Sequence, residues 1–386
     1  MRAARPRSLP GNAIVTPRER FVNTLLFRPV DRIPNMEIGL WPQTRERWLH
    51  EGMPKSVGCV LLAGDPYFQL DGAEGTALNA AGPLPPFEQR VLEETADYLV
   101  FVDQRGRTRQ GLKVDGRYTS VCMDHYISFP VKDRRSFLNM RKRYEGNPGA
   151  RYPAPAEWSA FAERSRRADT PFCLNNIWGD FGFYSMLRDW CGTEGVSCLF
   201  YDDPPLIHEC LEFLEGYILR LYARALREAC FDYIIIHEDL AGKGGPLIGP
   251  KLFREFILPH YKRYIRFLKA GGIPVVIVDT DGDFEALIPE FLEAGVDAFN
   301  PMEVAAGMDP VAMRRKYGKR FSMVGGVDKR EIAKGRRAID REVERLAPIV
   351  QEGGYIPWID HTVPPDTSLA DFQYYLERKR KVLAGE

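Results

Sequence analysis

The sequence has no long hydrophobic run and no excess of charge of one sign, and both absences exclude classes of protein. No apolar run reaches the roughly eighteen residues that a membrane-spanning helix needs. The basic start, MRAARPRSLPG, is not followed by the apolar core of a signal peptide. Lys and Arg together number 53, as do Asp and Glu, so no global positive field would hold the chain on nucleic acid. We expect a cytoplasmic protein with neither a membrane nor a nucleic acid as its partner.

Cysteines with the spacing of a disulfide framework or a zinc site are also missing. The 7 cysteines are scattered and odd in number, and no CxxC pair occurs. This pattern argues against both a disulfide-stabilised fold and a cysteine-rich zinc site. It favours reduced thiols, as in the cytosol.

What the sequence does contain is a repeated alternation of apolar runs and helical segments. From about Pro171 onward, each short apolar run is followed by a polar cluster rich in Gly or Asp, and then by a longer segment with helical periodicity. This order is typical of the βα units of a parallel sheet. The predicted strands are residues 172–177, 233–236, 274–278, 298–302, 321–324 and 355–359, with a further candidate at residues 32–38.

The segment KLFREFILPHYKRYIRFLKAGG, residues 251–272, shows the helical half of this pattern. Its apolar residues recur at steps of three and four, and Gly271 and Gly272 close it as a C-cap. Pro259 is expected to kink the helix. Barrels of the (β/α)8 type reach 386 residues as one unit. We therefore predict an α/β fold, a (β/α)8 TIM barrel, as a single domain over residues 16–386 with a flexible N-terminus over residues 1–15.

Residues 61–152 interrupt the alternation. Within them, VFVDQRGRTRQGLKVDGRYTSVCMDHYISFPV has the pattern of short alternating strands separated by turns that contain Gly. The sequence therefore predicts a β-hairpin insertion in the N-terminal part of the barrel.

Polar side chains follow almost every predicted strand. In a parallel barrel, the active site is built at the C-terminal ends of the strands and in the loops after them. Converging carboxylates repel one another, so acids with perturbed pKa values in a cleft are candidate functional groups. The alternative for any single acid is a helix N-cap. The residues at these strand ends are Glu37, Asn175, Asn176, Trp178, His237, Glu238, Asp239, Asp279, Asp281, Asp283, Glu303, Asp328, Asp360 and His361.

Three of these positions have a specific interpretation. The string DTDGD follows an aliphatic strand, so Asp279 and Asp281 are both expected to face the barrel mouth; the alternative is an Asx-type turn with Asp283 as a helix cap. His361 follows Asp360 directly, which suits proton transfer, although a structural histidine would show the same pattern. Trp178 is placed where a flat organic substrate would stack.

Long motifs of the chain resemble the uroporphyrinogen decarboxylase superfamily. They are TPRERFVNTLLFRPVDRIP, HEDLAGKGGPLIGPKLFREFILPHYKRYI, EAGVDAFNPMEVAAGMDPVAMRRKYGKRFSMVGGVDKREIAKG and GGYIPWIDHTVPPDTSL. The resemblance runs over most of the chain and is weakest over residues 61–152. It implies a (β/α)8 barrel and one of two activities, a decarboxylase or a zinc-dependent methyltransferase that exchanges methyl groups with a corrinoid protein.

Two departures from the superfamily patterns bear on the activity. The decarboxylases carry an arginine-rich segment early in the barrel, and the matching stretch here, NMEIGLWPQTRERW, places Glu37 where positive charge would be wanted. In the coenzyme M methyltransferases an HxC pair and a later cysteine hold zinc; Asp279 and Asp281 stand at the HxC positions, and Asp328 stands near the later cysteine. His361 matches the late active-site histidine of the family.

These observations favour a substrate-side methyltransferase that transfers a methyl group from a small methylated donor, of methoxy or methylamine type, to a corrinoid protein. The alternative is a uroporphyrinogen decarboxylase-type decarboxylase or a tetrapyrrole-binding protein. Zinc is a candidate metal at Asp279 and Asp281, and a homodimer is a candidate assembly. The expected catalytic residues are His237, Glu238, Asp239, Asp279, Asp281, Asp360 and His361. The expected substrate-binding residues are Glu37, Asn176, Trp178, Glu303 and Asp328.

Overall fold

A curled, seven-stranded parallel sheet forms the centre of the protein. The computed structural model describes residues 15–114, 116–118 and 124–386. Neighbouring strands of the sheet follow the order β1, β7, β8, β11, β12, β13 and β14, and every pair is parallel. The predicted α/β barrel is confirmed; β7, β12, β13 and β14 are shorter than expected, whereas β8 and β11 are not. The strands are β1 (Glu74–Gly75), β7 (Phe172–Cys173), β8 (Tyr233–His237), β11 (Val275–Asp279), β12 (Ala298–Asn300), β13 (Ser322–Val324) and β14 (Tyr355–Ile356).

The strand predicted at residues 32–38 is absent. Residues 33–40 are buried. Among the described residues, only the end of this segment is paired, through two isolated bridges, one to the chain after β14 and one to the chain before β1. Leu40 pairs with Val363 in parallel, and Gly39 pairs with Val60 in antiparallel orientation. Pro34 has no N–H group to donate to a ladder, so regular pairing stops here.

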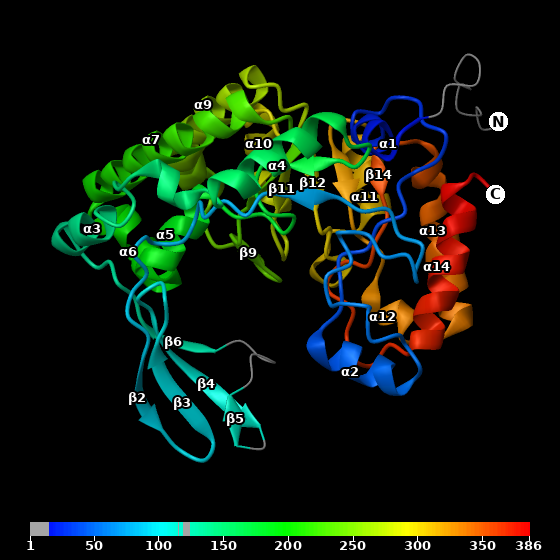
Figure 1. Cartoon of the computed structure of the whole chain (residues 1–386), viewed down its shortest axis with the longest axis horizontal. Coiled ribbons are helices and arrows are strands. Elements are labelled where there is room, and N and C mark those ends of the chain that lie inside the picture. Colours follow the sequence, from blue (N-terminus) through cyan, green and yellow to red (C-terminus); the bar gives the residue numbers. More distant parts are fainter. Residues whose placement is uncertain (1–14, 115, 119–123) are drawn as a thin grey trace.

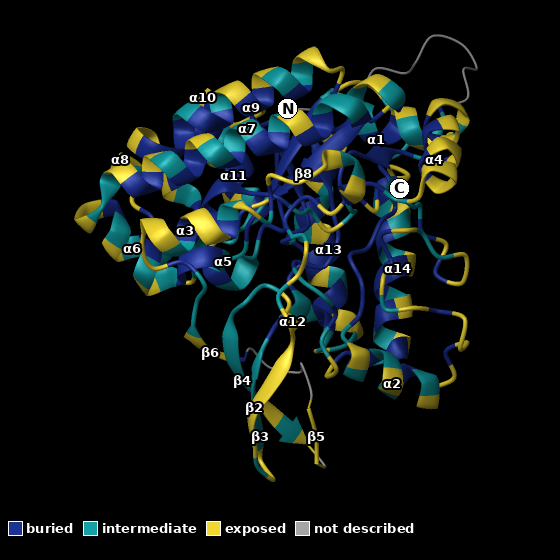
Figure 2. Ribbon diagram, turned by 60° about the vertical axis from the view of Figure 1, so that its left-hand side comes forward, coloured by how far each residue is buried: buried dark blue, intermediate teal, exposed yellow. Residues whose placement is uncertain are grey.

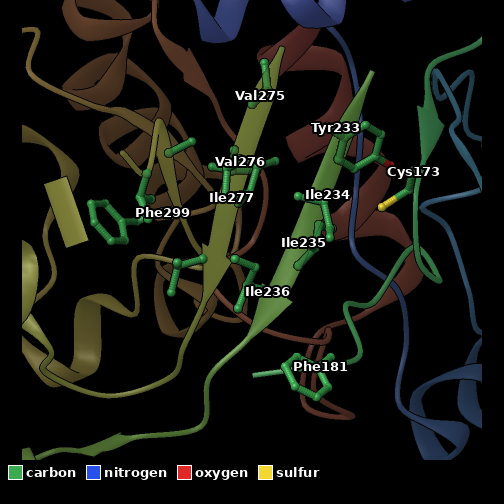
Figure 3. Close-up of a cluster of buried hydrophobic side chains, with 14 of the residues drawn as sticks. Cys173, Phe181, Tyr233, Ile234, Ile235, Ile236, Val275, Val276, Ile277 and Phe299 are labelled. Atoms are coloured by element: carbon green, nitrogen blue, oxygen red, sulfur yellow. The ribbon is translucent and has the colours of Figure 1, made fainter. Parts of the chain in front are cut away.

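The strands β8 and β11 form the most regular part of the barrel. Their residues are paired in register from Val275 and Tyr233 to Asp279 and His237. Residues 233–236 and 275–278 are all buried, because in a parallel barrel both faces of each strand are covered. Figure 3 shows these side chains next to one another, with Phe181 beside the C-terminal end of β8.

Helices surround the sheet, and α13 and α14 pack side by side along one edge of the molecule (Figure 1). The longer helices are α1 (Pro17–Leu25), α2 (Pro42–His50), α3 (Arg134–Arg141), α4 (Pro155–Arg167), α5 (Phe183–Cys191), α6 (Thr193–Asp202), α7 (Pro204–Glu228), α9 (Leu258–Ala270), α10 (Ile288–Ala294), α11 (Pro310–Tyr317), α13 (Arg336–Gln351) and α14 (Leu369–Leu383). Short helices are α8 (Pro250–Leu252), α12 (Lys329–Ile332) and the 3-10 turns Pro148–Arg151, Glu285–Leu287 and Val304–Ala306. Within the described residues, none of the helices combines the length and apolar character needed to cross a membrane.

The helix predicted over residues 251–272 is divided where Pro259 was expected to disturb it. A π-helical turn, Phe253–Ile257, separates α8 from α9. The Leu258 N–H bonds to the Phe253 carbonyl oxygen, five residues back. Pro259 has no N–H to donate to the turn before it, which is helical through Ile257 and Leu258, so the hydrogen-bond ladder is interrupted at this point.

The predicted β-hairpin insertion is present and projects from the barrel (Figure 1). Its antiparallel strands are β2 (Arg90–Glu94), β3 (Tyr98–Val102), β4 (Thr108–Val114), β5 (Arg117–Tyr118) and β6 (His125–Ser128). Strand β2 is exposed along its whole length (Figure 2). A second antiparallel pair, β9 (Ala241–Gly242) and β10 (Gly245–Pro246), lies in the loop after β8. The N-terminus predicted to be flexible lies outside the described residues, apart from Val15.

Candidate active site

Three adjacent strands end in side chains that are hydrogen-bonded to one another. Asp279, at the end of β11, is the register partner of both His237 on β8 and Asn300 on β12. Nδ1 of His237 lies 2.9 Å from Oδ2 of Asp279, and Nδ2 of Asn300 donates to Oδ1 of Asp279 at 2.6 Å. Both carboxylate oxygens of Asp279 are therefore engaged, and they fix the position of the imidazole ring.

His237 carries a positive charge at neutral pH. Burial lowers its pKa, but the hydrogen bond to Asp279 and the charges of Asp239 and Asp281 outweigh burial and raise the pKa to about 9. The side chain is still 47% exposed. Within the described part of the chain, no residue is hydrogen-bonded to Nε2, so this proton is available to a bound molecule.

A cavity of about 570 Å³ opens beside His237. A cavity of this size and concave form suits a small organic ligand. The β-hairpin insertion forms one wall of the cavity, and helix α5, the start of α6 and the barrel strands form the others. The lining residues are Ala81, Arg105, Arg107, Tyr126, Phe129, Asn176, Gly179, Asp180, Ser185, Met186, Arg188, Asp189, Thr193, Glu194, His237 and Asp239.

Ion pairs hold the insertion against α5 at this cavity. Asp189 on α5 accepts from Arg107 Nη1 at 2.6 Å and also pairs with Arg105. Arg107 is tied on its other side to Asp103. On the barrel side, Arg188 pairs with Asp239. Ion pairs between elements that are far apart in the sequence therefore hold the wall of the cavity together.

A second group of predicted residues meets at the mouth outside this cavity. Oδ2 of Asp281 lies 3.8 Å from Nε2 of His361, and the His361 ring stacks on Trp41 at 5.9 Å between centroids. Burial raises the pKa of Asp281 to about 6, with Glu303 among the carboxylates that add to this and His361 opposing it. Lys329 donates to Glu303 at 3.3 Å.

Glu238 makes its hydrogen bonds inside the protein. It is fully buried, and its two oxygens accept from the N–H groups of Tyr184 and Ser185 at 2.9 and 2.8 Å, in the first turn of α5, and from the Tyr261 hydroxyl. Burial raises the pKa of this carboxyl group. Gly182 makes the close approach possible, because a Cβ there would lie 2.3 Å from the His237 carbonyl oxygen.

Asp360 and Asp328 also serve neighbouring backbone. Asp360 accepts from the N–H groups of Val304 at 3.0 Å and Lys329 at 3.1 Å. Asp328 is the N-cap of α12 and pairs with Arg330 at 2.6 Å. Both acids therefore make the helix-cap and loop contacts that were the alternative to a role in the active site.

The remaining predicted residues are divided between the cavity and the core. Asn176 lines the cavity, and its Oδ1 accepts from the Trp178 N–H at 2.9 Å. Trp178 itself is 38% exposed and lies outside the cavity lining. Glu37 is fully buried and pairs with Lys379 and the Tyr375 hydroxyl. Asp283 accepts from the Glu285 N–H at 3.1 Å, the Asx turn that DTDGD allows.

Several residues that line the cavity were not predicted from the sequence. Asp180 follows Gly179 shortly after β7, so it had the same strand-end position as the acids that were selected. Arg105 and Arg107 lie in the insertion, and Arg188 lies on α5, where nothing in the sequence relates them to strand ends. Only the folded arrangement places these side chains at one cavity.

The donor set at Asp279 and Asp281 does not fit a zinc ion. Zinc in proteins takes three or four protein ligands, and among the described residues no group of three His, Cys, Asp or Glu side chains is arranged to hold a metal. Both oxygens of Asp279 already accept hydrogen bonds. Asp279 and Asp281 therefore do not form a zinc site, and the chemistry proposed below involves no zinc.

The fold is a (β/α)8-type barrel with polar side chains gathered at the C-terminal ends of its strands. The family model of uroporphyrinogen decarboxylase (URO-D) matches residues 184–382, just over half of the chain. The chain belongs to the uroporphyrinogen decarboxylase family, as its motifs predicted.

Curated relatives at low identity carry the name of this family, and one solved structure shares the fold. The chain is 27% identical over 197 residues to uroporphyrinogen decarboxylase of Thermus thermophilus, over 49% of this chain and 52% of the relative. It is 29% identical over 185 residues to that of Rhodococcus erythropolis, over 45% and 48%. The chain thus spans about half the length of the curated relatives it matches. A methyltransferase from Methanosarcina mazei shares the fold, with a TM-score of 0.58 and 16% identity over 95% of this chain and 99% of that one.

Proposed function

We propose that the protein is a substrate-side methyltransferase that transfers a methyl group from a small methylated donor, of methoxy or methylamine type, to a corrinoid protein. The observation that carries the proposal is the charged imidazole of His237, held by Asp279 at the wall of a cavity of about 570 Å³. A poor leaving group departs more easily when a positioned acid protonates it, and His237 is such a proton donor.

In this proposal the residues of the chain handle the proton. As the bond from the methyl carbon breaks, its electron pair stays on the leaving atom. A leaving oxygen takes the proton from Nε2 of His237, whereas a leaving ammonium nitrogen becomes a neutral amine without it. Asp279 keeps the ring oriented through Nδ1 and stabilises its positive charge. The corrinoid of the partner protein supplies the electron pair of the new bond to carbon. The negative charges of Asp239 and Asp281 add to this stabilisation of the protonated ring.

The test is methyl transfer to reduced cobalamin in the presence of the purified protein. We expect the absorbance of cob(I)alamin to decay only when protein and a methoxy or methylamine donor are both present. A corrinoid protein added in place of free cobalamin is expected to accelerate the decay. If none of these donors alkylates cob(I)alamin with the protein present, the proposal is wrong.

A decarboxylase or tetrapyrrole-binding protein is the second candidate. The observation that favours it is the presence of Arg105, Arg107 and Arg188 in the cavity wall, because guanidinium groups bind carboxylates bidentately. Each of these arginines, however, already contacts an acid of this chain. Titration with a polycarboxylated tetrapyrrole separates the candidates: an optical shift that saturates supports the second, and its absence removes it.

The proposed role of His237 predicts the pH dependence of kcat. The raised pKa keeps the ring protonated below about pH 9, so kcat is expected to fall as pH rises through that value. In Asp279→Asn the supporting charge is lost while burial continues to lower the pKa, so the fall in kcat is expected to move to lower pH. Initial rates of methyl transfer measured from pH 6 to 10 test this, and identical profiles for both proteins would exclude His237 as the acid.

A further inference from the structure

The charged side chains in the cavity wall are unevenly paired. Two acids, Asp180 and Glu194, form no ion pair with any residue that the structure describes. Glu194 lies in the first turn of α6, where the helix dipole stabilises a negative charge. Each cation in the wall, by contrast, contacts an acid of this chain; the pairs are Arg105–Asp189, Arg107–Asp189, Arg188–Asp239 and His237–Asp279.

Of these two acids, Asp180 is the more buried. It lies in the loop between β7 and α5 and is half-buried, and its Oδ2 accepts one hydrogen bond, from the Ala80 N–H at 3.2 Å. Burial raises its pKa to about 6, although Arg105 and His237 lower it, so the group is ionised at neutral pH. A half-buried carboxylate that forms no ion pair within the chain is stabilised when a cation binds beside it.

The proton of His237 restricts the type of methyl group that the donor carries. Loss of a methyl group from an ether leaves an oxygen anion, which needs a proton from an acid. Loss of a methyl group from an ammonium nitrogen leaves a neutral amine, which needs none. A protonated His237 therefore matches a methoxy group, and Asp180 matches a positive charge elsewhere on the same molecule.

We propose that the methyl donor is a methyl ether that carries an ammonium group, and that Asp180 binds this ammonium group. The inference rests on the proposed function and narrows its substrate class. The carbon–oxygen bond breaks as the methyl group is transferred to the corrinoid protein, the acceptor that would supply the electron pair of the new bond to carbon. The electron pair of the broken bond stays on oxygen, oxygen takes the proton from His237, and the ammonium group keeps its charge. Met186 and Phe129 in the wall supply apolar contacts for the carbon skeleton between these two ends.

The first test compares the binding of two probes of matched shape. Isothermal titration calorimetry with 4-methoxybenzylammonium and neutral 4-methoxybenzyl alcohol is expected to show that the wild-type protein binds the cation at least about tenfold more tightly. Asp180→Asn is expected to abolish this preference, and Asp180→Glu to retain most of it. Asp169→Asn, an exposed position away from the cavity, is the matched control and should bind like wild type. Equal affinity of wild type for both probes would overturn the inference.

The pH dependence of binding gives an independent readout. Affinity for the ammonium probe is expected to fall as pH falls through about 6, because Asp180 becomes protonated. His237, whose pKa is about 9, keeps its charge over this range, and guanidinium groups in general do not titrate in it. The nearby tyrosines stay neutral because burial raises their pKa values; they are Tyr217 and Tyr222 on α7 and Tyr264 on α9. An affinity that does not change between pH 7 and pH 5 would contradict the role of Asp180.

Methyl transfer from the same two probes to cob(I)alamin separates this inference from the function on which it rests. Demethylation of both probes with equal kcat/KM would leave the methyltransferase proposal standing and overturn the ammonium site. Binding of the cationic probe through Asp180 without demethylation of either probe would support the ammonium site and contradict the methyltransferase.

Discussion

Replacement of His237 by Gln is expected to lower kcat for methyl transfer by about 10²–10⁴-fold, the usual contribution of a positioned general acid. KM should change little, because the glutamine side chain preserves a polar wall but has no proton to give. The loss is expected to be smaller for donors with electron-withdrawing substituents, because their leaving oxygen needs the proton less. Steady-state rates over a series of substituted methoxybenzenes measure this.

A matched control for this variant is His208→Gln. His208 lies on α7 and stacks on Phe256, away from the cavity, so its replacement should leave kcat unchanged. If His237→Gln retains the wild-type rate for all donors, the proton comes from another group. His361 and Asp281, which lie 3.8 Å apart at the same mouth, would then be the next groups to replace.

Replacement of Lys379 by Met is expected to lower the free energy of unfolding by about 3–5 kcal/mol, because it leaves the Glu37 carboxylate buried without its cation. Both side chains are almost completely buried, with exposures of 2% for Lys379 and 0% for Glu37. Burial also lowers the pKa of Lys379, with Glu37 opposing this. Urea denaturation followed by circular dichroism measures the change.

The same helix offers a control for this variant. Lys381 pairs with Glu377 on the surface of α14, where the two side chains are 48% and 56% exposed. Lys381→Met should therefore cost no more than about 1 kcal/mol. Adding Glu37→Gln to Lys379→Met is expected to recover much of the lost stability, because the buried charge is removed. Equal effects of the two lysine replacements would show that the buried pair adds nothing.

The sequence allowed most of the barrel to be predicted, because a parallel strand is marked by local features. Aliphatic runs such as residues 274–278, followed by Asp or Gly and a helical segment, require no knowledge of distant contacts. The hairpin insertion was predictable for the same reason. Residues 32–38 were wrongly predicted as a strand. Whether they pair with a neighbouring strand depends on Pro34 and on distant segments that close the barrel.

The candidate site was predicted less completely. His237 and Asp279 were each expected at a strand end, and the parallel register of β8 and β11 makes them neighbours, but their hydrogen bond was not predicted. The sequence did not distinguish between the roles of two adjacent acids. Glu238 points into the protein toward α5, whereas Asp239 lines the cavity. Glu37 had a strand-end position in the sequence but meets Lys379 in the core.

By itself, then, the sequence determined the barrel, its insertion, the family and some of the polar residues at the strand ends, because periodicity and motifs are local properties of the chain. The tertiary structure alone decided which of those residues share one cavity, which acids have cations and which do not. Burial and pairing depend on residues far apart in the chain, such as Asp189 with Arg107 or Asp180 with Ala80, and these contacts set the charge that a ligand would meet.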